Sequence, residues 1–218
     1  MKIFIKNNAL SITFFSIFLF SLVAQIHFGH EEYNKELTEQ GAAAVDLGGY
    51  LTSGHFVEST FENWESEFLQ MALFVVFTIF LMEKGSSESK KFDGTDEVDR
   101  EPDPNRKSAP WPVKKGGLAL ALYKHSLTIA FAILFIVSMV LHFYGSLDDA
   151  NVEHALKGQA LQTAGDFISD SKFWFESFQN WQSEFLSIFA MIFLSIYLRQ
   201  KGSSQSKPVD APHSETGD

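Results

Sequence analysis

Four apolar runs, separated by charged stretches, restrict what this chain can fold into. The first run covers residues 9–28, twenty residues without a charged side chain, and it follows Lys2 and Lys6. A helix of that length crosses a hydrocarbon layer of ~30 Å at ~1.5 Å per residue. A cleaved signal peptide also combines a basic start with an apolar stretch. The first run therefore predicts either a membrane-spanning helix or a signal peptide.

A second copy of this run decides between the two interpretations. Residues 126–144 form a matching segment, in which Leu-Thr-Ile at 127–129 stands 117 positions after Leu-Ser-Ile at 10–12. An internal segment of this kind is not a signal sequence. We therefore expect the first copy to be retained as a membrane-spanning helix.

The other two apolar runs are too short to cross a membrane alone. Residues 68–82 and 185–198 contain fifteen and fourteen residues, which is roughly 22 Å as helix. Each run overlaps the pattern Asn-Trp-x-Ser-Glu-Phe-Leu and is followed by Lys-Gly-Ser-Ser-x-Ser-Lys. Tryptophan favours the membrane interface, so the spans are expected to begin near Trp64 and Trp181. That register places Glu67 and Glu184 at the interface or slightly below it.

The distribution of basic residues predicts the orientation. The N-terminus, the central connector and the C-terminal tail hold fourteen of the seventeen lysines and arginines. Only Lys35, Lys157 and Lys172 fall in the two acidic loops that follow the long runs. Because cytoplasmic segments carry an excess of Lys and Arg, both termini and the connector are expected in the cytoplasm, and both loops outside.

These patterns predict an all-α polytopic membrane protein, with four transmembrane helices arranged as two tandem hairpins of the same orientation. The external loops are expected to be partly helical, because Gly41 aligns with Gly158 and Gly48 with Gly165. A parallel repeat of this kind differs from the inverted repeat of many transporters. The predicted segments are a first hairpin repeat at 1–90 with spans at about 9–28 and 64–83, a polar cytoplasmic connector at 91–117, a second hairpin repeat at 118–207 with spans at about 125–144 and 181–199, and a cytoplasmic tail at 208–218.

The two short runs carry a polar stripe on one helical face, since their polar residues recur at spacings of three and four. The positions that fall within this arc are Asn63, Glu67, Gln70, Phe74 and Thr78 in the first copy, and Asn180, Glu184, Ser187, Met191 and Ser195 in the second. Together with Trp64 and Trp181, the polar members are the candidate functional residues. In lipid, such a stripe should face protein or water.

Three interpretations of the stripe are open. We favour a helix–helix seam in which the polar side chains bond neighbouring helices. In the second interpretation, Glu67 and Glu184 form a paired-carboxylate site for a cation or a proton at the outer mouth of a path. In the third, these glutamates are exposed at the interface. The apolar runs contain no proline and no Gly-x-x-x-Gly pair, so we expect neither the broken helices of transporters nor the close-approach dimer motif.

Several classes of function are disfavoured. The absence of cysteine removes disulfides and thiolate metal sites, and a net charge of −10 argues against nucleic-acid binding. No phosphate-binding loop, nucleophile elbow or zinc-protease motif is present. His27 and His30 could share a metal, but snorkelling or hydrogen-bonded histidines at the membrane interface are the preferred interpretation. We therefore expect neither enzymatic activity, nor a cofactor, nor a metal site.

The repeated motifs, together with Tyr-Leu-Thr-Ser-x-x-Phe at 50–56 and Leu-Tyr-Lys-His-Ser-Leu at 122–127, resemble a family of small bacterial integral membrane proteins of unknown function. Where that family tends to have Arg-Gly-Ser-Pro-Glu-Ser-Lys, this chain has Lys84 and Ser87, and then Lys201, Ser204 and Gln205. The resemblance implies a multi-pass protein of the bacterial cytoplasmic membrane and supplies no catalytic residues. The expected partners are the lipid bilayer and either further copies of the chain or another membrane protein.

Overall fold

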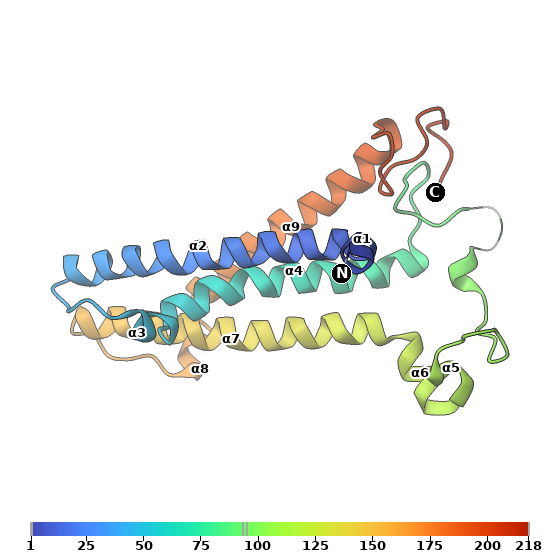
Figure 1. Ribbon diagram of the computed structural model, residues 1–218. Helices are drawn as coiled ribbons and strands as arrows, with labels where there is room; N and C mark the ends of the chain where they lie inside the picture. The colour runs from blue at the N-terminus through green and yellow to red at the C-terminus, as the bar shows by residue number, and fades with distance from the viewer. Residues whose placement is uncertain (1, 93, 95, 218) are drawn as a thin grey trace. The chain divides into compact units, whose positions relative to one another are not determined.

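The computed structural model describes residues 2–92, 94 and 96–217, and its regular structure is entirely helical (Figure 1). The all-α prediction is confirmed for these residues. The predicted connector includes residues 93 and 95, which lie outside the described part of the chain. The helices are α1 (Lys2–Asn7), α2 (Ala9–Glu39), α3 (Leu47–Leu51), α4 (Gly54–Phe80), the 3-10 helix η1 (Glu97–Asp99), α5 (Trp111–Lys115), α6 (Gly117–Lys124), α7 (Ser126–Leu156), α8 (Ala164–Phe167) and α9 (Ser171–Tyr197).

The chain forms two compact units, and each unit takes residues from both predicted hairpins. Unit 1 consists of Met1–Phe61 and Val140–Phe173, and unit 2 consists of Glu62–Met139 and Trp174–Asp218. The division falls inside α4, α7 and α9, so each of these helices contributes residues to both units.

Two helices of the described chain, α2 and α7, are long and apolar enough to cross a membrane. Each has 31 residues, and within their most apolar stretches 0% of α2 and 11% of α7 is buried by protein. The helices α4 and α9 have 27 residues each but do not meet the same criterion. Both contain acidic residues, among them Glu62 and Glu65 in α4 and Glu176 and Glu184 in α9. The sequence predicts four spans, and by length and composition the structure supports two.

In unit 1, the loop that follows each of the helices α2 and α7 is fixed to that helix by an asparagine. The Asn34 side chain accepts a hydrogen bond from the Val45 N–H at 2.7 Å and donates one to the Val45 carbonyl at 3.0 Å. Asn151 makes the same two bonds with Gln162, at 2.7 Å and 3.1 Å. Gly41 and Gly158 supply the turns between, with φ of +82° and +66°, in the left-handed region that favours glycine. Both loops are therefore ordered, as their matched glycines predict.

Histidine and aromatic side chains fill the inside of the first loop. The His30 Nε2 atom lies 2.8 Å from the Val45 carbonyl oxygen, so this histidine is hydrogen-bonded as the preferred interpretation predicts. Tyr50 is fully buried, with its ring centroid 5.9 Å from that of Tyr33 and 5.4 Å from that of Phe56. These contacts give the loop a small core of its own.

Two glycines let the backbones of α4 and α7 approach closely within unit 1. A Cβ atom on Gly54 would lie 2.3 Å from the Asp149 nitrogen, and one on Gly145 would lie 2.6 Å from the Glu58 nitrogen. Lys172 adds ion pairs to Glu58 at 3.2 Å and to Asp149 at 3.5 Å. This contact differs from the Gly-x-x-x-Gly motif that the apolar runs lack, because it pairs one glycine of each helix with the backbone of the other. The two glycines lie on different helices, so no search for a spacing within one helix could find them.

Candidate functional site along α4 and α9

Within unit 2, α4 and α9 are joined by the buried side chain of Gln70, which is 7% exposed. Its Nε2 atom donates to the Glu184 carbonyl at 2.9 Å and to the Ser187 hydroxyl at 3.0 Å. An amide in apolar surroundings needs such partners, because leaving its donors unsatisfied is costly. The structure thus brings together three of the predicted stripe residues. We call the line of contacts between the two helices the α4–α9 seam.

A second bond of the seam was not predicted. Trp181 Nε1–H donates to the Glu65 carboxylate at 3.2 Å, and Glu65 is fully buried. Glu65 occupies the variable position of the Asn-Trp-x-Ser-Glu-Phe-Leu pattern, where the second copy has Gln182, so the repeat gave no reason to select it. The one available signal was chemical, since a buried indole N–H requires an acceptor.

At the other end of the seam, Ser195 contacts the turn that follows α4. Ser195 is 8% exposed, and its hydroxyl donates to the Ile192 carbonyl at 2.9 Å. Its oxygen lies 2.9 Å from the hydroxyl of the buried Ser86. Since the Ser195 proton is engaged by Ile192, Ser86 acts as the donor between the two. Thr78 bonds only within its own helix, where it donates to the Phe74 carbonyl at 2.9 Å.

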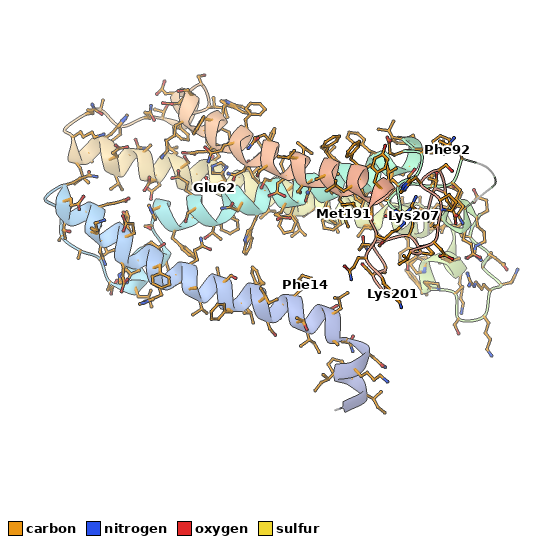
Figure 2. The ribbon with its side chains drawn as sticks, turned by 90° about the horizontal axis from the view of Figure 1, so that it is seen from above. Phe14, Glu62, Phe92, Met191, Lys201 and Lys207 are labelled. Atoms are coloured by element: carbon orange, nitrogen blue, oxygen red, sulfur yellow. The ribbon has the colours of Figure 1, made fainter. Side chains whose placement is uncertain are left out.

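The remaining side chains of the predicted set differ in exposure and in partners. Asn63 and Glu67 are exposed and Trp64 is half-buried, while Asn180 donates to the Glu176 carbonyl of its own helix at 3.1 Å. Glu184 is half-buried and lies near enough to Glu67 for the two charges to interact. Met191 is 40% exposed on α9 (Figure 2). The predicted arc does not coincide with the buried face of α4. Polarity alone does not distinguish a buried polar residue from one at an interface, so the sequence did not determine which face of the helix is buried.

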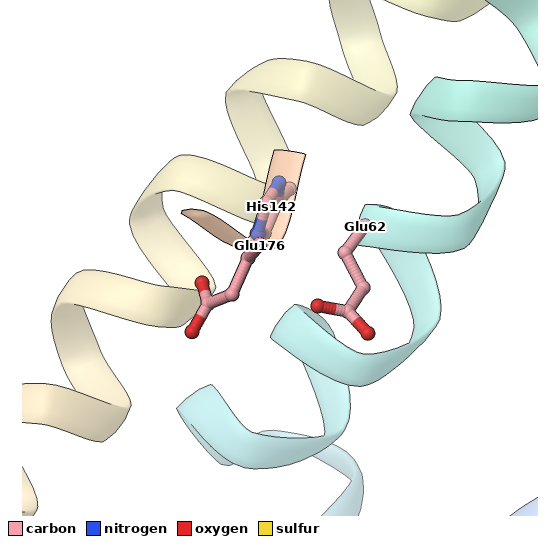
Figure 3. A group of neighbouring side chains, drawn as sticks. All are labelled: Glu62, His142 and Glu176. Carbon is pink, nitrogen blue, oxygen red and sulfur yellow. The ribbon is translucent and has the colours of Figure 1, made fainter. Parts of the chain in front are cut away.

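Unit 2 also contains an acidic pair that sequence reasoning did not select. Glu62 on α4 and Glu176 on α9 place carboxylate oxygens within 4.8 Å of one another (Figure 3). Both side chains are half-buried, and both make further interactions. Like charges at this separation repel unless neighbouring groups compensate them. The pair makes this part of α4 and α9 acidic.

The two Lys-Gly-Ser-Ser-x-Ser-Lys segments form the same turn. In the first, the Glu83 N–H donates to the Ser89 hydroxyl at 2.9 Å, and in the second the Gln200 N–H donates to the Ser206 hydroxyl at 2.9 Å. Gly85 and Gly202 adopt φ of +91° and +86°. The helices before these turns end at Phe80 and Tyr197. The glycines therefore shape a turn beyond the helix end.

The C-terminal tail is folded onto the first of these turns. Lys207, 1% exposed, donates from Nζ to the carbonyls of Pro212 and His213, both at 3.2 Å, and of Glu215 at 2.7 Å (Figure 2). Thr216 accepts from the Gly85 N–H at 2.9 Å. Burial lowers the pKa of Lys207, Arg199 lowers this pKa further, and Glu215 acts in the opposite direction. The sequence predicted only a polar tail, whereas the structure shows one held by specific bonds.

Below Gln70 the two helices leave an apolar groove of about 260 Å³. A second, polar cavity of about 620 Å³ lies beside the first turn, and the two share Thr78, Glu88 and Ser89. The groove is lined mainly by Leu73, Phe74, Phe77, Phe185, Ile188 and Ile192.

The geometry defines an all-helical protein in which two helices could cross a membrane and two others are joined by a polar seam. Residues 1–218, the whole chain, match the family described as domain of unknown function (DUF6766). The chain belongs to this family. No curated protein and no solved structure matches it.

Proposed function

We propose that the chain is a multi-pass protein of the bacterial cytoplasmic membrane, with α2, α4, α7 and α9 as four spans and both termini in the cytoplasm. The exposed apolar lengths of α2 and α7 support insertion. The 27 residues of α4 and of α9 correspond to about 40 Å of helix, which suffices when their charged first turns lie at the interface. The matching bonds of Asn34 and Asn151 support two tandem copies of one hairpin.

Within this membrane protein, a structural or accessory role is the function that the α4–α9 seam supports best. One observation carries it: Gln70 and Trp181 direct their donors at protein acceptors across the seam. Polar groups bonded in this way stabilise helix packing. The exposed aromatic residues of α9, among them Phe189 and Phe193, offer a surface for a second copy or for another membrane protein. We assign no enzymatic activity.

Crosslinking in native membranes tests this role. The parent chain has no cysteine, so Phe189→Cys introduces a single thiol at a side chain that is 60% exposed. A defined dimer or a discrete hetero-complex is expected after oxidation or treatment with a bifunctional maleimide. Ser195→Cys, which is buried against Ser86, is the matched control and should give none. Monomer alone from Phe189→Cys, together with monomer alone in a detergent-free nanodisc preparation, would contradict the role.

The interaction between the charges of Glu67 and Glu184 favours a second candidate, a path for cations or protons. Two carboxylates that share a site respond to pH and to bound cations. In liposomes, this candidate requires the parent to carry proton or potassium flux above that of protein-free vesicles. It also requires the variant with both Glu67→Gln and Glu184→Gln to lose that flux. Equal flux from the parent and the double variant would exclude it.

A further inference from the structure

The apolar groove and the polar cavity of unit 2 form one continuous surface with two different ends. The groove follows α4 from Gln70 to Thr78, about 12 Å at about 1.5 Å per residue, and continues past the helix end to Glu83. One leaflet of a bilayer contributes about 15 Å of hydrocarbon. Because the side chains of both helices that line the groove are almost all apolar, it suits an acyl chain in length and chemistry.

The polar cavity begins where the groove ends. Ser87, Ser89, Lys90 and Lys91 are among the residues that line it. Lys90 already binds Asp99, with Nζ–O distances of 3.0 Å and 3.1 Å. In the proposed topology this end of α4 lies at the cytoplasmic interface, where the headgroups of phospholipids are found.

The charge of the cavity discriminates between headgroups. Its wall combines two lysines with four acidic residues, Glu88, Asp96, Glu97 and Asp99. An excess of carboxylates disfavours an anionic headgroup and favours one that carries an ammonium group. The Lys91 ammonium can accommodate the single phosphate of the same headgroup, whereas the Ser87 and Ser89 hydroxyls already donate to the carbonyls of Gln205 and Lys90. A primary ammonium also donates hydrogen bonds to carboxylates, which a quaternary ammonium cannot do.

From this continuity we propose that the groove and cavity bind one phospholipid with a primary-ammonium headgroup, phosphatidylethanolamine. Its acyl chain lies along α4 and α9, and its headgroup lies between the side chains of Lys91 and Glu97. The site rests on the proposed membrane insertion and adds to it a choice of lipid. It also gives the first turn a role in holding a headgroup.

Native mass spectrometry of the full-length protein tests the site, after release from nanodiscs with equal parts phosphatidylethanolamine, phosphatidylcholine and phosphatidylglycerol of the same chain length. One retained phosphatidylethanolamine per chain is expected, enriched about fivefold or more over each competitor. Ile192→Trp fills the groove and should abolish retention. Glu97→Gln, at an exposed position, should leave binding but bring the enrichment over phosphatidylcholine close to one.

Matched variants separate these effects from general damage. Phe189→Trp changes an exposed residue of α9 outside the groove, and Asp210→Asn changes an exposed carboxylate outside the polar cavity. Both should behave as the parent. Equal retention of the three lipids, preference for phosphatidylglycerol, or unchanged retention in Ile192→Trp would overturn the proposal. The last result would mean that the retained lipid binds outside the groove. Extraction by alkaline carbonate tests insertion separately: a chain that resists it yet shows no lipid preference refutes only the lipid site.

Discussion

Gly145→Ala is expected to destabilise the protein by about 2 kcal/mol, the scale of an overpacked contact. The new methyl group would lie 2.6 Å from the Glu58 nitrogen and 3.0 Å from the Val57 carbonyl carbon. Both atoms belong to the backbone of α4, so neither can move aside as the end of a flexible side chain could. In an exposed helix the same substitution stabilises, because alanine loses less backbone entropy than glycine on folding. The sign of the effect therefore reports the close approach of α4 and α7.

Thermal unfolding of the purified full-length protein in detergent measures this effect. For a chain of this size, about 2 kcal/mol corresponds to a Tm lower by about 4–8 °C. Gly165→Ala is the matched control, since its methyl group would meet only the Thr163 hydroxyl at 3.7 Å, and it should leave Tm unchanged or raise it slightly. A Gly145→Ala protein as stable as the parent would show that the two backbones are not in contact.

Lys207→Met is expected to release the C-terminal tail from the first turn. Methionine keeps the apolar length of the lysine side chain but leaves the carbonyls of Pro212, His213 and Glu215 without their donor. The loss of these charge-assisted bonds should cost about 3 kcal/mol. The bonds of Thr216 and Gly217 to the first turn depend on the same tail conformation, so they should open with it.

Hydrogen–deuterium exchange of residues 208–217 detects this release. Exchange is expected to become faster on the order of a hundredfold, because local opening sets the exchange rate of amides held in this way. Lys201→Met removes an exposed lysine from the second turn and should leave the tail as protected as in the parent. Unchanged protection in Lys207→Met would contradict a tail anchored through the ammonium group.

The sequence predicted the long helices well because their signal is local. The uncharged run at 9–28 begins where α2 begins, at Ala9, and its copy predicts α7 in the same way. Gln70, Ser187 and Ser195 were selected because polar residues inside apolar helices need partners, and the structure supplies those partners. In such cases the physical requirement can be read from a short segment.

What was missed depends on contacts between distant parts of the chain. Glu65 is buried because Trp181 donates to it from another helix. Nothing in the sequence around Glu65 distinguishes it from the neighbouring glutamates. Lys207 is buried because backbone carbonyls surround its ammonium group, and carbonyls leave no pattern in a sequence. The exposure of Asn63 and Glu67 likewise depends on how α4 is rotated, which polarity does not fix.

Labelling of single cysteines in intact cells tests most directly the proposal that four helices cross the membrane. Ala43→Cys, Asn105→Cys, Gln159→Cys and Asp210→Cys place one thiol each at exposed positions in a chain without cysteine. With four spans, a membrane-impermeant maleimide labels positions 43 and 159 in intact cells and positions 105 and 210 only after lysis. Labelling of position 105 with protection of position 159 would show that only α2 and α7 cross, and it would contradict the four-span topology.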